Sequence, residues 1–104
     1  MRRMMLVAGL GVAWAMPVCA QDGEVAAGRE VAQRWCAECH VIDRNPATAR
    51  DNVPDFPAIA NRPNVTADAL RTFLSEPHGR MPPLNLSRNT IDNAIAYILS
   101  LRAR

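Results

Sequence analysis

Residues 35–40 read WCAECH, in which Cys36 and Cys39 stand three positions apart and His40 follows the second cysteine directly. On a helix, side chains three and four positions apart face the same side. Two thiols and one imidazole can therefore converge on a single object. The nature of that object decides the fold, because so short a chain needs more than apolar side chains to complete its core.

The C-x-x-C-H pattern is typical of covalent attachment of a c-type haem. The thiols of Cys36 and Cys39 would add to the two haem vinyl groups, and His40 would be the proximal iron ligand. Three other interpretations remain. A thioredoxin-like redox pair normally follows a strand, and a disulfide between cysteines this close would constrain little of the chain. A zinc site needs four ligands, so it would have to recruit His78.

The start of the chain has the three-part layout of a secretory signal peptide. Two arginines precede an apolar run over 4–16, and a site of small residues ends at Ala20. We expect residues 1–20 to be cleaved and residues 21–104 to form one domain in the periplasm. The apolar run is too short to span a bilayer comfortably. A retained anchor and lipidation of Cys19 are the alternatives.

Cleavage changes the composition of the chain. Removal of two arginines from the 12 basic residues leaves ten, which balance the ten acidic ones. No basic excess then argues for nucleic acid or an anionic membrane as a partner. Of the three cysteines only Cys36 and Cys39 remain, and of the five methionines only Met81.

Apolar residues at helical spacing predict an all-α domain of about four short helices, joined by long loops rich in proline and asparagine. No segment alternates with the period of a strand. The predicted helices are 24–39, a short turn near 57–61, one capped by Thr66 that ends near Ser75, and one capped by Ser87 or Asn89. The apolar stripes of the last two are Leu70, Phe73 and Leu74, and Ile91, Ala94, Ile95, Ile98 and Leu99.

Four segments resemble class I c-type cytochromes of the small bacterial kind. GREVAQRWCAECH (28–40) is similar to the N-terminal helix of that family, and VPDFPAIANRP (53–63) to the segment after its haem motif. MPPLNLS (81–87) resembles the loop of the distal methionine, and IDNAIAYILSLR (91–102) the C-terminal helix. The resemblance implies the small cytochrome c fold, with crossing N- and C-terminal helices wrapped around one covalently bound haem c and its iron.

Met81 is the expected sixth ligand of the iron. A soft thioether suits haem iron, and His/Met ligation raises the reduction potential. Pro82 and Pro83 stiffen the loop, so that ligation costs less entropy. The alternatives are that Met81 fills a gap in the core or that His78 is the ligand instead. We expect Cys36, Cys39, His40 and Met81 to border one common cavity.

The resemblance also implies roles for residues around the site. Pro54 matches a proline whose carbonyl accepts the N–H of the proximal imidazole, which would orient the ring and raise its donor strength. Arg62 matches an arginine that reaches a haem propionate, with a plain surface arginine as the alternative. Gly28 and Tyr97 match the helix crossing, where a missing side chain admits an aromatic ring.

One position departs from the family pattern. Ala32 stands where many relatives carry an aromatic residue. We expect the nearby Trp35 to take over part of the packing that such a residue would provide.

With both axial positions filled by side chains, the iron would have no open site for a substrate, which suits electron transfer rather than catalysis. The expected protein is a monomeric periplasmic electron carrier that moves one electron per haem between respiratory or dehydrogenase partners. Its partners would be periplasmic or membrane-bound redox proteins, bound transiently, and neither nucleic acid nor a small-molecule substrate. The alternatives are a haem-binding subunit of a larger complex and a sensor or enzyme with a labile sixth site.

Overall fold

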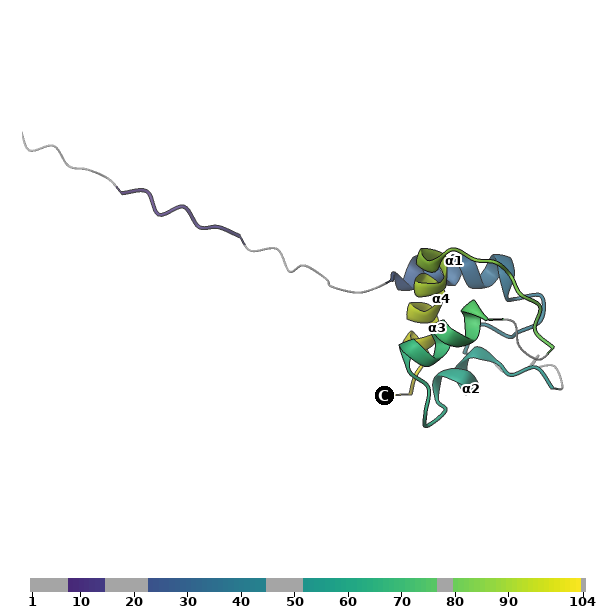
Figure 1. Ribbon diagram of the computed structural model, residues 1–104. Coiled ribbons are helices and arrows are strands. Elements are labelled where there is room, and N and C mark those ends of the chain that lie inside the picture. The colour runs from purple at the N-terminus through teal and green to yellow at the C-terminus, as the bar shows by residue number, and fades with distance from the viewer. Residues whose placement is uncertain (1–7, 15–22, 45–51, 77–79, 104) are drawn as a thin grey trace, which may run out of the picture.

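A computed structural model describes residues 8–14, 23–44, 52–76 and 80–103. These ranges contain helices and no strand, which confirms the all-α prediction (Figure 1). None of the helices in this part of the chain is both long and apolar enough to cross a membrane. The four helices are α1 (Val25–Trp35), α2 (Phe56–Ala60), α3 (Ala67–Ser75) and α4 (Arg88–Ser100).

The first helix ends four residues earlier than the apolar pattern predicts. The backbone N–H groups of Cys36 and Ala37 both donate to the carbonyl of Ala32, at 2.9 and 2.8 Å. A bond from five residues ahead is typical of a helix terminus. The motif cysteines therefore lie on a turn that follows α1 (Val25–Trp35) and not within the helix.

The first and last helices cross at Gly28, as the resemblance implies (Figure 1). A Cβ atom at this position would overlap the carbonyl oxygen of Asn93 and would lie 2.8 Å from the Cβ of Tyr97. Only glycine allows the two backbones to come this close. The side chain of Asn93 also accepts a hydrogen bond from the backbone N–H of Glu24 at 3.0 Å, which fixes the start of α1 on α4.

Helices α2, α3 and α4 all begin at side-chain caps. Thr66 accepts a hydrogen bond from the N–H of Ala69 at 3.1 Å, as predicted. Of the two proposed caps for α4, Ser87 is the one used. α2 begins at Phe56, slightly earlier than expected, because Asp55 accepts the N–H of Ala58 at 2.7 Å. Such caps satisfy N–H groups that have no partner within the helix.

The C-terminal end of α4 is tied to the loops around α2. The Arg44 guanidinium donates to the carbonyl oxygens of Ser100 and Leu101, at 2.9 and 3.3 Å. The side-chain oxygen of Asn61 accepts the backbone N–H of Ala103 at 2.7 Å. Arg102 reaches the carbonyl of Ala60 at 3.1 Å. The arginine bonds satisfy backbone carbonyls near the ends of α4 and α2, and the Asn61 bond satisfies a backbone N–H just after α4.

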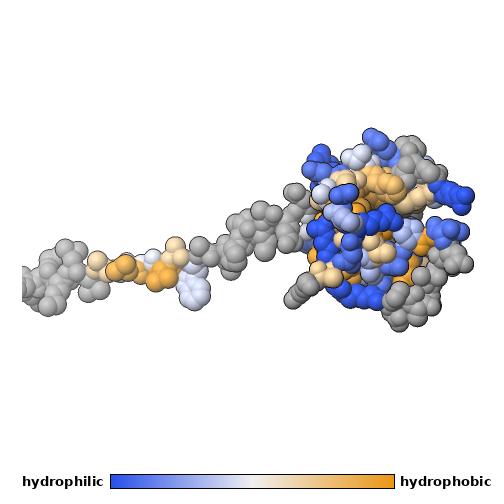
Figure 2. Space-filling model, turned by 90° about the horizontal axis from the view of Figure 1, so that it is seen from below, coloured by the Kyte–Doolittle hydropathy of each residue, from blue (hydrophilic) through white to orange (hydrophobic). Residues whose placement is uncertain are grey.

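The core lies between α4 and the other helices, and two aromatic residues depart from the expected packing. Phe73 and Trp35 are each 49% exposed. On α3, Leu70 is buried and Leu74 half-buried, while Phe73 lies on the exposed side. Trp35 is the last residue of α1 and only part of its side chain is covered, whereas Ala32 is fully buried, so the share of the packing that Trp35 takes over stays a prediction. Viewed from below, the helical part presents a mostly hydrophilic surface with apolar residues between the polar ones (Figure 2).

Candidate haem site

The turn after α1 brings the three motif residues together. The backbone N–H groups of Cys39 and His40 both donate to the carbonyl of Cys36, at 3.1 and 2.8 Å. Both thiols are free, with Cys36 buried and Cys39 exposed. A single carbonyl thus organises the turn, and the two thiols and the imidazole come from one compact unit.

Burial makes the Cys36 thiol harder to deprotonate. It raises the pKa of the Cys36 thiol to about 11, so this sulfur stays protonated at neutral pH. Zinc binds cysteine as the thiolate, so a zinc ion at Cys36 would have to displace this proton. Within the described ranges no group of three or more His, Cys, Asp or Glu side chains could hold a metal ion. His78, the fourth ligand that a zinc site would need, lies outside the described residues.

His40 is oriented by a backbone carbonyl. Its Nδ1 atom lies 2.7 Å from the carbonyl oxygen of Pro54, which can only accept, so Nδ1 carries the proton. This confirms the expected hydrogen bond from the His40 ring to the carbonyl of Pro54. A neutral imidazole protonated at Nδ1 has its lone pair at Nε2, the arrangement of a metal-binding histidine. The ring also lies 5.5 Å from that of Phe56, centroid to centroid, at an angle of 48°.

Met81 lies in the segment between α3 and α4, and it is half-buried. It lines a small cavity together with Leu74 and Leu86. A second cavity, of about 540 Å³, shares Leu74 and Leu86 with the first but is not lined by Met81. Cys36, Cys39 and His40 line neither, so the expected common cavity is not one of these two.

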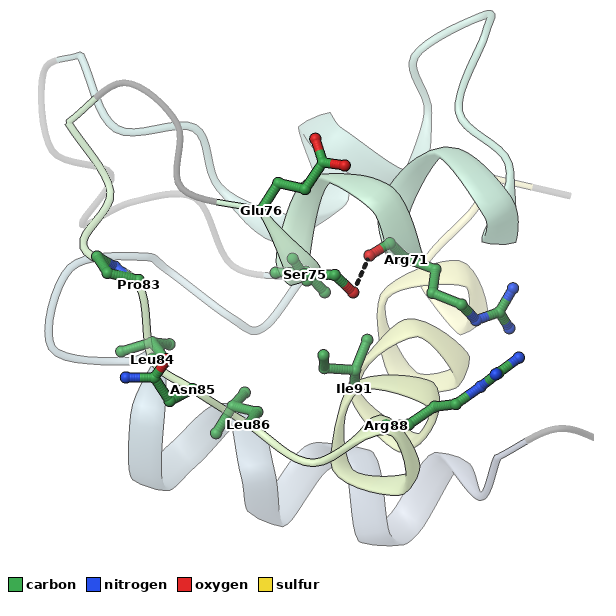
Figure 3. Close-up of a pocket in the computed structure, with 10 residues that line it drawn as sticks. Arg71, Ser75, Glu76, Pro83, Leu84, Asn85, Leu86, Arg88 and Ile91 are labelled. Atoms are coloured by element: carbon green, nitrogen blue, oxygen red, sulfur yellow. Dashed lines mark hydrogen bonds between the residues drawn. The ribbon is translucent and has the colours of Figure 1, made fainter.

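The larger cavity opens between the C-terminal half of α3, the loop 83–86 and the start of α4 (Figure 3). Its lining mixes apolar side chains with the polar groups of Ser75 and Asn85 and with two arginines, none of which the sequence pattern indicated. The Ser75 hydroxyl donates to the carbonyl of Arg71 at 2.6 Å. The Arg71 guanidinium pairs with Asp92 of α4 at 2.9 Å. The Arg71 side chain at this cavity therefore helps to hold α3 on α4.

The residues of the motif turn fit a haem c. Two free thiols three positions apart can form the two thioether bonds, and an imidazole with Nδ1 bound to Pro54 presents Nε2 to an iron. The side chain of Arg62 is exposed just after α2, and its propionate contact stays a prediction. Sequence reasoning missed the hydrogen bonds to the carbonyls of Val41 and Ile42. They come from the N–H of Phe56 and the hydroxyl of Tyr97, which are distant in the sequence.

Comparison with known proteins identifies the family. The family model described as "Cytochrome C oxidase, cbb3-type, subunit III" matches residues 23–98. Cytochrome c-552 of Bradyrhizobium diazoefficiens is 44% identical over 75 residues, which are 72% of this chain and 72% of that protein. No solved structure gives a significant match. The matched region runs from before α1 into α4 and includes the C-x-x-C-H turn, so the chain belongs to the cytochrome c family and is a small monohaem c-type cytochrome that binds haem c, with its iron, covalently.

Proposed function

We propose that this cytochrome carries single electrons between exported redox proteins, with His40 and Met81 as the axial ligands of its iron. The observation that carries the proposal is the 2.7 Å bond from His40 Nδ1 to the carbonyl of Pro54. It fixes the tautomer that a proximal ligand needs and raises the donor strength of the ring. Haem c supplies the redox chemistry when bound, and the protein supplies ligands, orientation and burial.

Cys36 and Cys39 are the proposed attachment points. Their thiols are free and lie on the turn that the Cys36 carbonyl organises. Covalent attachment places the group directly beside the His40 imidazole. It also fills the need of so small a domain for additional stabilising links.

Met81 is the proposed distal ligand. It is half-buried and lies directly before Pro82 and Pro83, whose fixed φ angles restrict the loop. With two strong axial ligands the iron has no open position for a substrate, so the chain carries electrons and catalyses no bond chemistry. A thioether ligand also holds the reduction potential above that of a bis-histidine site.

The layout of residues 1–20 supports export, followed by cleavage after Ala20 and release of residues 21–104 into the periplasm. The charges of the released domain balance, which favours small, transient contacts without strong electrostatic steering. The partners are accordingly periplasmic or membrane-bound redox proteins, and the domain is monomeric.

The proposal can be tested on the full-length chain, produced in a host with an active haem-attachment system. We expect the periplasmic fraction to contain a coloured protein whose denatured mass equals residues 21–104 plus one haem. The reduced protein should bind carbon monoxide poorly, because Met81 occupies the sixth position. Ready formation of a carbon monoxide complex would instead point to a labile sixth site and would contradict the carrier.

A second candidate function follows from the description of the matching family, which names a subunit of an oxidase. In that case the domain would stay within a membrane complex rather than move between partners. Size-exclusion chromatography of detergent-solubilised membranes separates the two. A carrier elutes alone at the mass of the domain, whereas a subunit co-elutes with other haem proteins after salt washing.

A further inference from the structure

The turn that carries His40 continues into residues 40–42, which we call the proximal segment. Each of its three residues is held by a hydrogen bond to a different residue outside the segment. The bonds are His40 Nδ1 to the Pro54 oxygen at 2.7 Å, Phe56 N to the Val41 oxygen at 2.9 Å, and Tyr97 Oη to the Ile42 oxygen at 2.9 Å. His40 is thus the first residue of a segment in which every residue is held by a hydrogen bond.

The bond from Tyr97 differs from the other two. It comes from a side chain of α4, whereas Pro54 and Phe56 flank the start of α2. Tyr97 and Ile42 are 5% and 6% exposed, so water does not readily replace the hydroxyl. A buried carbonyl that loses its donor bears the full cost of desolvation. The position of the Ile42 carbonyl therefore depends on the Tyr97 hydroxyl.

The charged neighbours of the Tyr97 hydroxyl contribute less to fixing the backbone than its bond to Ile42 does. The Tyr97 oxygen lies 3.3 Å from a carboxylate oxygen of Asp43, which in turn lies 3.4 Å from the Arg29 guanidinium. The side chains of Arg29 and Asp43 are 53% and 56% exposed, and exposed pairs of this kind are weak. The buried bond to Ile42 is the contact that can fix the backbone.

We propose that Tyr97 is a positioning residue for the proximal ligand, in addition to its packing at the helix crossing. Its hydroxyl fixes Ile42, and Phe56 fixes Val41, so that the His40 ring stays aligned with the Pro54 carbonyl. That alignment sets the strength of the Nδ1–H bond and with it the basicity of the imidazole. The inference rests on the proposed function, in which His40 binds the iron.

The test compares Tyr97→Phe with Thr66→Ala in the haem-loaded protein. The first variant keeps the aromatic ring, whose centroid lies 6.4 Å from that of Phe56, and removes only the hydroxyl. The second removes the exposed N-cap of α3 and lowers stability without touching the proximal segment. For each, the reduction potential, the NMR resonances of the His40 ring in the oxidised protein and the denaturation midpoint are measured.

We expect Tyr97→Phe to raise the reduction potential and to shift the His40 ring resonances, because a weaker Nδ1–H bond makes the imidazole a poorer donor to the oxidised iron. Thr66→Ala should lower the denaturation midpoint and leave potential and resonances unchanged. An unchanged or lowered potential in Tyr97→Phe contradicts the inference, as does an equal shift in Thr66→Ala. Failure of the proposed function is seen separately, as a wild-type protein without covalent haem or without His40 resonances shifted by the iron.

Discussion

The two segments that supply the proposed iron ligands are built in opposite ways. The proximal segment 40–42 is held by hydrogen bonds from parts of the chain that are distant in sequence. The distal segment 81–87 has restricted backbone angles, through Pro82 and Pro83 and through Asn85 at a φ of 51°, and Met81 at its start also forms a β-bridge with another part of the chain. The proximal segment is therefore held by tertiary hydrogen bonds at every residue, whereas the loop after Met81 is restricted by its own backbone.

This difference suggests a division of roles. Bonds from α2 and α4 make the orientation of the imidazole sensitive to the whole fold, so the proximal side can tune the reduction potential. The distal side needs only to keep a sulfur within reach, and a stiff loop does so at a low cost in entropy. Substitutions on the two sides should therefore differ both in the property that they change and in the size of the change.

The largest contrast is expected between His40→Ala and Met81→Ala. Loss of His40 removes the ligand that the motif turn holds beside the attachment cysteines, so little haem-loaded protein should accumulate. Loss of Met81 leaves the turn and both thiols intact, so covalent haem should persist with a changed spectrum and ready binding of carbon monoxide. Haem staining after denaturing electrophoresis and optical spectra measure both effects.

Equal yields of haem-loaded protein from these two variants would contradict the proposed difference in role between the proximal and distal segments. The double replacement Cys36→Ala with Cys39→Ala is the control, because it should abolish covalent haem in any background.

The next largest effect is expected on the proximal side, from Asp55→Ala. It removes the cap that starts α2 directly after Pro54, at a cost of about 1 kcal/mol in the free energy of unfolding. Asp55→Asn is the matched control, since asparagine caps as well as aspartate. Chemical denaturation of the haem-loaded proteins gives the difference, and equal losses in both variants would mean that charge and not capping is what Asp55 provides.

A smaller effect is expected from the left-handed asparagines, one on each side. Asn52 has a φ of 68° shortly before Pro54, and Asn85 a φ of 51° after Met81. Replacement by alanine should cost roughly 1 kcal/mol at each position, because alanine lacks the polar side chain whose local hydrogen bonds let asparagine adopt this conformation, whereas glycine should be tolerated.

The two alanine variants should also differ in their spectra. Asn85→Ala should weaken the methionine–iron bond, and Asn52→Ala should leave that bond intact. Weakening of the bond to a similar degree in both variants would argue against a locally determined distal loop.

The smallest effect concerns alkaline pH. Burial, followed by the nearby Asp43 carboxylate, raises the pKa of Tyr97 above its usual value. The folded state therefore favours the neutral phenol, and this contribution to stability is present below about pH 10 and is lost as the pH rises through the folded pKa. Tyr97 is the only tyrosine in the chain, so its ultraviolet difference spectrum reports its ionisation directly.

Tyr97→Phe should remove this component of the alkaline loss of stability. If the stability of wild type and Tyr97→Phe falls in parallel above pH 10, the hydroxyl does not contribute in the way proposed.

Much of the fold follows from local signals in the sequence. Thr66 and the apolar residues after it predict α3, including its end at Ser75. The end of α1 was not predictable in this way, because residues 36–39 contain no glycine or proline to mark it, and a bond to the Ala32 carbonyl ends the helix. The exposure of Phe73 was missed because the apolar pattern of so short a helix does not specify which side meets α4.

The candidate site divides in the same way. The motif spacing indicates Cys36, Cys39 and His40, and the count of methionines after cleavage indicates Met81. The contact between Tyr97 and Ile42 joins residues 55 positions apart. Only the folded chain brings such groups together, so no local pattern could have indicated it.

The most direct test of the account is the NMR signal of the methionine methyl group in the reduced protein. After the proposed cleavage the chain would contain one methionine, so labelling of methionine methyl groups would give one resonance. If Met81 and His40 are the two iron ligands, as proposed, the haem ring should shift this resonance far upfield. A resonance at the ordinary position of a solvent-exposed methionine, in a protein that carries covalent haem, would contradict the account.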